Sequence, residues 1–128
     1  FLMTCQELAT AVQYEIATVH CVLNNYGWLS IRDLQMDVYG EERGYATEFR
    51  GEDTGELYSP SFTKIADAFG CHGEFVEKPE EVAPALERAF ESGKPAVLEI
   101  PVQYEHPWSE GKTYGWWDVP IPAYLRNG

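Results

Sequence analysis

The sequence predicts an α/β fold built on a parallel sheet, and two observations lead to it. Helical and strand patterns alternate along the chain in the order helix, strand, helix, helix, strand, helix, strand. Strands separated by helices favour a parallel sheet covered by helices. Apolar types make up 45 % of the 128 residues, which suits the core of one compact domain.

The first predicted helix begins at a capping box. The Thr4 hydroxyl can accept from the Glu7 amide while the Glu7 carboxylate reaches back to the Thr4 amide, so Glu7 is interpreted as a helix cap. An apolar stripe with the spacing of one helical face follows at Leu8, Ala11, Val12 and Ile16.

Further along the chain, apolar runs predict strands at 17–23, 72–76 and 95–102. The first run is short, mostly apolar and rich in β-branched residues, which predicts a strand buried on both faces. Helices are predicted at 28–35, 61–69 and 79–92. The helix at 61–69 has Ser61 as N-cap and ends at Gly70.

Two segments lack a period. Residues 36–60 are rich in glycine and acidic side chains, so we expect an irregular surface excursion, with closure over an active site as the alternative. Residues 103–128 form an aromatic and proline-rich C-terminal tail, which we expect to be extended chain packed on a surface. Clustered Trp and Tyr also favour an intersubunit contact or an active-site cover there.

Composition excludes several classes of protein. Nine Lys and Arg against 21 Asp and Glu give a formal charge of −12 without a basic cluster, so we expect no nucleic-acid partner. No apolar run reaches the roughly 18 residues of a membrane span, so we expect no membrane partner. The three cysteines lack the spacing of a zinc or redox pair. Free thiols in a reducing compartment predict a cytoplasmic protein.

The turn after the first strand is the best candidate for chemistry. Residues Asn24 to Gly27 follow that strand at its carboxyl end, where open α/β sheets bind ligands. Amide and carbonyl oxygens suit Mg²⁺ or Ca²⁺, and the N-terminus of the next helix favours a phosphate. A plain turn is the alternative at this point.

The N-terminal residues resemble a known family. Residues 1–14, an apolar strand and then Leu-Asn-Asn-Tyr-Gly-Trp at 23–28 look like the cofactor-binding stretch of thiamin diphosphate enzymes, closest to the acetolactate synthase-like group. That family's marker is Gly-Asp-Gly followed at a set distance by Asn-Asn. If Gly-Asp-Gly-Ser stood just before Phe1, the spacing to Asn24 would fit. Segments 59–70 and 93–100 resemble later parts of the same family.

The resemblance implies a Rossmann-like, three-layer thiamin diphosphate-binding fold. Residues 1–102 would be the C-terminal part of that domain, which is therefore partial. By position, the Asn25 side-chain oxygen and the Gly27 backbone carbonyl would bind Mg²⁺, and backbone amides near Trp28 and Leu29 would bind the diphosphate. Ile31 would face the substrate. The family's Gly-Asp-Gly is absent from these residues, and no residue here is assigned a catalytic role.

The implied activity is decarboxylation of a 2-oxo acid with transfer of the acyl carbanion to a carbonyl acceptor. The family's activating glutamate lies on another domain or subunit, so a homodimer or homotetramer is expected. Some relatives also bind FAD through a region outside these residues, so FAD stays an open expectation. The alternatives are a non-catalytic or regulatory module of the same fold, and a flavodoxin-like or receiver-like binding module.

Overall fold

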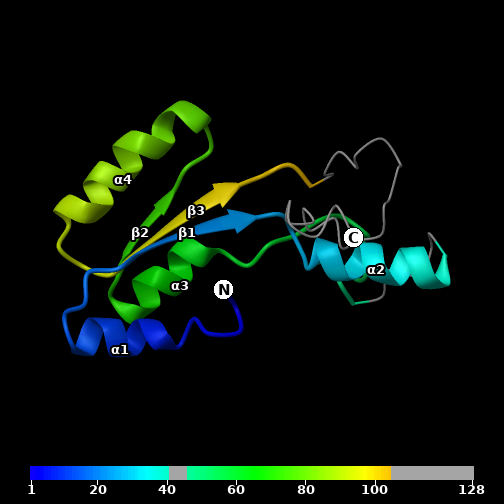
Figure 1. Cartoon of the computed structure of the whole chain (residues 1–128), viewed down its shortest axis with the longest axis horizontal. Coiled ribbons are helices and arrows are strands. Elements are labelled where there is room, and N and C mark those ends of the chain that lie inside the picture. The colour runs from blue at the N-terminus through cyan, green and yellow to red at the C-terminus, as the bar shows by residue number, and fades with distance from the viewer. Residues whose placement is uncertain (41–45, 105–128) are drawn as a thin grey trace, which may run out of the picture.

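The computed structural model describes residues 1–40 and 46–104. Its centre is a three-stranded parallel sheet in the order β1-β3-β2, formed by β1 (Val19–Asn24), β2 (His72–Phe75) and β3 (Ala96–Pro101). Helices α1 (Glu7–Gln13) and α3 (Phe62–Phe69) cover one face, and α4 (Val82–Glu91) covers the other (Figure 1). The predicted three-layer α/β fold and its element order are confirmed.

The central strand β3 connects two apolar clusters. Its side chains alternate between the two faces of the sheet, so Val97 lies in the cluster under α1 and α3, while Ala96 and Leu98 lie in the cluster under α4. All three are fully buried. Burial of both faces explains why this strand reads as a continuous apolar run.

The start of α1 differs from the prediction. Residues 2–6 form turns, in which the Thr4 amide donates to the Phe1 carbonyl and the Glu7 amide donates to the Thr4 carbonyl. The helix therefore begins at Glu7 without a side-chain cap, and the predicted capping box is wrong because backbone turns already use these groups. Ile16 also lies beyond the helix and is exposed, since Glu15 adopts a positive φ of 54° after its end.

Strand β1 is exposed where burial on both faces was predicted. Among the described strands it pairs with β3 alone, so it lies at an edge of the sheet. Its side chains at His20, Cys21 and Leu23 are exposed. A short apolar run does not distinguish a central strand from an edge strand, because strands of both kinds bury apolar side chains on a face of the sheet.

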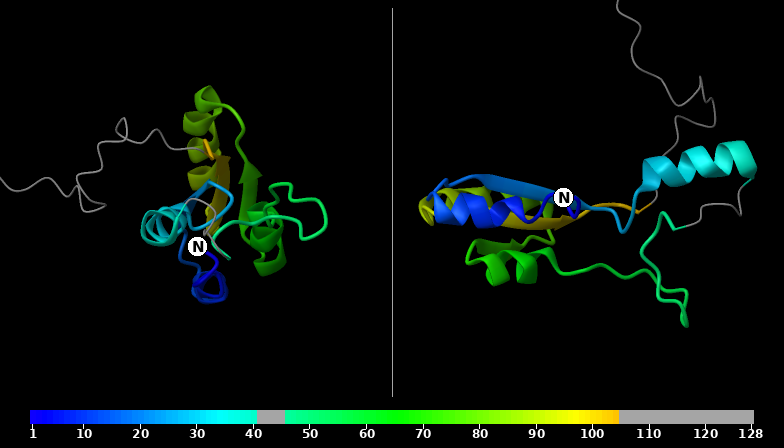
Figure 2. Two further views of the ribbon diagram at one scale, coloured as in Figure 1. Left: turned by 90° about the vertical axis from the view of Figure 1, so that its right-hand side faces the viewer. Right: turned by 90° about the horizontal axis from the view of Figure 1, so that it is seen from below.

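Helix α2 (Leu29–Tyr39) is longer than predicted and extends beyond the carboxyl ends of the strands (Figure 2). The predicted excursion at 36–60 therefore begins inside this helix. Its described remainder is not irregular throughout, because isolated antiparallel bridges join Gly27 to Glu48 and Arg50 to Leu57. Residues 41–45, and the predicted tail beyond Tyr104, lie outside the described residues.

The later elements follow the prediction closely. Ser61 caps α3 by accepting from the Lys64 amide at 3.3 Å, and Gly70 ends the helix in the left-handed conformation with φ 82°. The predicted helix at 79–92 begins with a short 3-10 turn, η1 (Pro79–Glu81), before α4. Across the described ranges, no helix is long and apolar enough to cross a membrane.

Candidate cofactor-binding site

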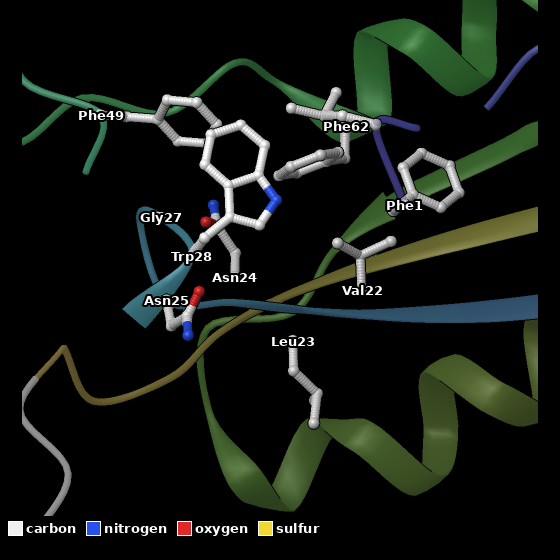
Figure 3. A pocket seen from close by; sticks show the side chains of 10 residues that line it. Phe1, Val22, Leu23, Asn24, Asn25, Gly27, Trp28, Phe49 and Phe62 are labelled. Carbon is white, nitrogen blue, oxygen red and sulfur yellow. The ribbon is translucent and has the colours of Figure 1, made fainter. Parts of the chain in front are cut away.

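A pocket lies at the carboxyl end of β1, where the predicted turn begins (Figure 3). Its wall comes from the N-terminal residues, the end of β1, the turn itself, the 46–50 segment and the start of α3. The lining residues are Phe1, Leu2, Val22, Leu23, Asn24, Asn25, Gly27, Trp28, Phe49 and Phe62. Asn25, Gly27 and Trp28, three of the predicted site residues, are therefore brought together at one opening.

Asn24 is the buried anchor of the turn. Its Nδ2 donates to Ser59 Oγ at 2.7 Å and to Glu99 Oε1 at 3.2 Å. Its Oδ1 accepts from the Tyr26 amide at 3.2 Å, which is the hydrogen bond of an Asx-turn. With its side-chain polar atoms bonded inside the protein, Asn24 holds the backbone of the turn in place.

Asn25 is the residue that this turn presents. Its side chain is only partly buried, and within residues 1–40 and 46–104 it makes no hydrogen bond. Tyr26 follows with a positive φ of 63°, so the chain reverses immediately after Asn25. An amide oxygen that accepts no hydrogen bond from a described residue, in the lining of a pocket, is a hard ligand suited to Mg²⁺.

Gly27 is fixed by the segment that passes behind it. The Trp28 amide donates to the Thr47 carbonyl at 2.7 Å, and the Phe49 amide donates to the Tyr26 carbonyl at 2.8 Å. These two bonds lie on either side of Gly27 and Glu48, which therefore form a non-hydrogen-bonded antiparallel pair. In such a pair the residues' own N–H and C=O groups point away from the partner strand, so the Gly27 carbonyl faces away from this segment.

Only glycine fits at this position. A Cβ on Gly27 would lie 2.4 Å from the Thr47 carbonyl oxygen and 2.9 Å from the Glu48 Cα, and both are backbone atoms that cannot swing aside. The close approach therefore explains the glycine by packing. It also keeps the Gly27 carbonyl facing away from residues 46–50.

The diphosphate donors differ in part from the prediction. The Trp28 amide is already used by Thr47, so it is not free for an anion. The amides of Leu29 and Ser30, which open α2, make no hydrogen bond to any described residue. A helix N-terminus of this kind attracts phosphate groups. Trp28 instead contributes its indole to the pocket wall, edge-on to Phe49 at a centroid distance of 5.1 Å.

The structure does not bring Ile31 into the pocket wall. Ile31 lies on the first turn of α2 with 46 % of its surface exposed, and it is not among the lining residues. Its role toward a substrate therefore stays a prediction.

Sequence reasoning missed Glu99, a buried carboxylate in β3. Its Oε2 accepts from the Phe62 amide at 2.9 Å and the Thr63 amide at 3.3 Å, which open α3, while Oε1 accepts from Asn24. Glu99 therefore links the site turn to a helix N-terminus, where a negative charge is favourable. The available signal was an acidic residue within an otherwise apolar strand.

The oxygen donors that the turn offers are neutral. Among the described residues, no group of three His, Cys, Asp or Glu side chains lies close enough to hold a metal ion. The donor set at the turn is neutral: one side-chain amide oxygen and one backbone carbonyl, next to free amides at a helix N-terminus. This set fits a divalent cation that is bound jointly with a phosphate-bearing ligand.

Fold and turn together define a class of protein, the layered α/β domains with a ligand-binding turn at the carboxyl edge of a parallel sheet. Residues 1–100 match the family model "Thiamine pyrophosphate enzyme, C-terminal TPP binding domain". The chain belongs to this family, and the resemblance seen in the sequence is confirmed.

Individual relatives are enzymes with different reactions. The chain is 30 % identical over 80 % of its length to a "Probable acetolactate synthase large subunit" of Methanococcus aeolicus. It is 35 % identical over 77 % of its length to the sulfoacetaldehyde acetyltransferase of Alcaligenes xylosoxydans xylosoxydans. A 3D-(3,5/4)-trihydroxycyclohexane-1,2-dione hydrolase of Lacticaseibacillus casei is 30 % identical over 99 % of the chain. The matched parts are 16 %, 15 % and 19 % of these relatives, so the chain spans less than a fifth of their length.

Proposed function

We propose that this chain is part of a thiamin diphosphate- and Mg²⁺-dependent enzyme that decarboxylates a 2-oxo acid and transfers the acyl unit to a carbonyl acceptor. The observation that carries the proposal is the turn at 24–27: Asn25, whose side-chain amide makes no hydrogen bond to a described residue, and Gly27, whose carbonyl faces away from residues 46–50, both line one pocket. The family match supports the cofactor, and the acetolactate synthase relative supports the reaction.

In this proposal the residues of the chain bind and orient. The Asn25 Oδ1 and the Gly27 carbonyl hold Mg²⁺, and the Leu29 and Ser30 amides receive the diphosphate at the start of α2. Trp28 contributes its indole to one wall of the pocket. Thiamin diphosphate, when bound, supplies the nucleophile and the electron sink that break a carbon–carbon bond next to a carbonyl.

The remaining parts of the site would come from elsewhere in the assembly. The activating glutamate has no assigned residue in this chain, and we propose that another domain or a second subunit provides it. A homodimer or homotetramer meets this need. Ile31 facing the substrate, FAD binding and a cytoplasmic location remain predictions.

A second candidate reaction is hydrolysis of a cyclic 1,2-dione. The observation in its favour is the length of one alignment, because the match to the L. casei hydrolase covers 99 % of the chain and so includes most of the tail at 103–128. The match to the acetolactate synthase relative covers 80 %. Both reactions break a carbon–carbon bond beside a carbonyl, and they differ in whether water or a second carbonyl compound completes the reaction.

Substrate assays of the intact protein separate the candidates. With thiamin diphosphate and Mg²⁺ added, the first proposal predicts release of CO₂ from a 2-oxo acid and formation of a new carbon–carbon bond, both stopped by EDTA. Metal-dependent loss of a cyclic 1,2-dione without CO₂ release would support the hydrolase instead. If cofactor binds and neither class of substrate is consumed, both proposed reactions are wrong.

A further inference from the structure

A network of charged groups holds the segment behind Gly27. The Arg32 guanidinium of α2 donates to Glu48 at 3.2 Å and to the Tyr104 hydroxyl at 2.7 Å. Arg50 donates to the other Glu48 oxygen and, at 3.1 Å, to the same hydroxyl. Both guanidinium groups also lie over the Tyr104 ring, 5.1 Å and 5.6 Å from its centroid. Three separate parts of the chain therefore meet at Glu48.

The network is partly shielded from water, so the attraction between its charges is stronger than in an exposed surface ion pair. The side chains of Arg32 and Glu48 are 13 % and 17 % exposed, against 43 % for Arg50. Burial alone would raise the pKa of Glu48, but hydrogen bonds from Tyr104, Arg50 and Arg32 outweigh burial and lower this pKa. Charge-assisted bonds of this kind also fix geometry.

Glu48 lies where the network meets the site turn. It is the residue directly opposite Gly27 in the antiparallel bridge. The bonds from Trp28 to Thr47 and from Phe49 to Tyr26 lie on either side of it. Holding Glu48 therefore holds the peptide groups of residues 26–28, and with them the direction of the Gly27 carbonyl.

We propose that Glu48 is a positioning residue for the metal site: its bonds to Arg32, Arg50 and Tyr104 keep the Gly27 carbonyl in the orientation that a small divalent cation requires. The inference rests on the proposed function of the turn. Mg²⁺ needs near-ideal octahedral geometry, whereas Ca²⁺ accepts irregular and flexible ligand sets. A loosened Gly27 carbonyl therefore weakens Mg²⁺ binding more than Ca²⁺ binding.

The test titrates Mg²⁺ and, separately, Ca²⁺ into the intact protein at saturating thiamin diphosphate, with tryptophan fluorescence as readout. Loss of an outer partner of a metal ligand costs about 10-fold or more in metal affinity. We expect that rise in the Mg²⁺ Kd for Glu48→Ala, a smaller rise for Glu48→Gln, and a smaller change in the Ca²⁺ Kd of each. The matched control is Glu52→Gln, which removes an exposed carboxylate from the same segment and leaves both constants unchanged.

The outcomes separate the two proposals. If the unmodified protein shows no metal-dependent binding of thiamin diphosphate, the proposed function is wrong, and the role of Glu48 is overturned with it. If the unmodified protein binds and Glu48→Ala matches Glu52→Gln, or weakens both metals equally, only the positioning role is overturned. Should Glu48→Ala fail to fold, Tyr104→Phe removes the shared hydroxyl alone, and the Mg²⁺ Kd must still rise more than the Ca²⁺ Kd.

Discussion

Gly27→Ala is expected to break the contact between the site turn and the segment behind it. The added Cβ would lie 2.4 Å from the Thr47 carbonyl oxygen, so the segment must move away and both flanking backbone hydrogen bonds are lost. Each bond is worth about 1 kcal/mol net, which predicts a loss of about 2 kcal/mol in local stability. Since the Gly27 carbonyl turns with the backbone, Mg²⁺ affinity should fall about 10-fold or more.

Hydrogen exchange of the peptides covering residues 26–31 and 46–50, together with a Mg²⁺ titration, measures both effects. Gly51→Ala is the matched control, because the nearest contact of its Cβ would be the Thr54 side-chain hydroxyl rather than a backbone atom. Unchanged exchange and unchanged Mg²⁺ affinity in Gly27→Ala would contradict the assignment of the bridge and of the carbonyl ligand.

Glu99→Leu is expected to destabilise the contact that connects β3 with the start of α3 and with the site turn. Glu99 is 5 % exposed, and leucine would leave the Phe62 and Thr63 amides without this acceptor. The Asn24 side-chain amide would lose one of its two acceptors and keep Ser59. A buried donor without its partner costs about 1–3 kcal/mol, so a loss of about 3 kcal/mol or more is predicted. Glu99→Gln keeps the shape and one acceptor oxygen, and it should cost less.

The start of α3 is the place to measure this effect. At 1.4 kcal/mol per tenfold change, a loss of about 3 kcal/mol speeds local hydrogen exchange by about 100-fold in peptides that span residues 61–69. The control is Glu77→Gln, which removes an exposed carboxylate near the end of β2. Equal exchange rates in Glu99→Leu and Glu77→Gln would show that Glu99 does not cap α3.

The parts of the fold predicted well carry local signals. Helix α3 has a hydroxyl at its N-cap, an apolar face and a glycine at its end, and each of these acts within a few residues. Strand β3 is buried on both faces, so its apolar run needed no information about neighbours. The alternation of such segments was enough to predict a parallel sheet between layers of helices.

The parts missed depend on contacts between distant residues. The edge position of β1 follows from which strands pair, and a strand's own sequence does not contain that information. The capping box at Thr4 failed because backbone turns at Phe1 and Thr4 took the same groups. Arg32, Glu48 and Tyr104 come from three separate segments, and no periodicity connects them.

In the candidate site too, local features were predicted and features that depend on distant residues were missed. The resemblance pointed to Asn25 and Gly27, and the structure places both in the pocket wall. It could not show that Thr47 takes the Trp28 amide, which moves the free amides to Leu29 and Ser30. Nor could it show that Asn24 is an internal anchor, because that role depends on Ser59 and Glu99.

The most direct test of the account is a thiamin diphosphate titration of the intact protein and of its Asn25→Ala variant, with Mg²⁺ and with EDTA. The chain has four tryptophans, and Trp28 lines the proposed site, so fluorescence should report binding. Gln13→Ala, which removes an exposed amide from α1, is the control. We expect saturable, Mg²⁺-dependent quenching in the unmodified protein, and thiamin diphosphate binding about 10-fold or more weaker in Asn25→Ala. Binding that is equally tight in EDTA, or unchanged in Asn25→Ala, would contradict the account.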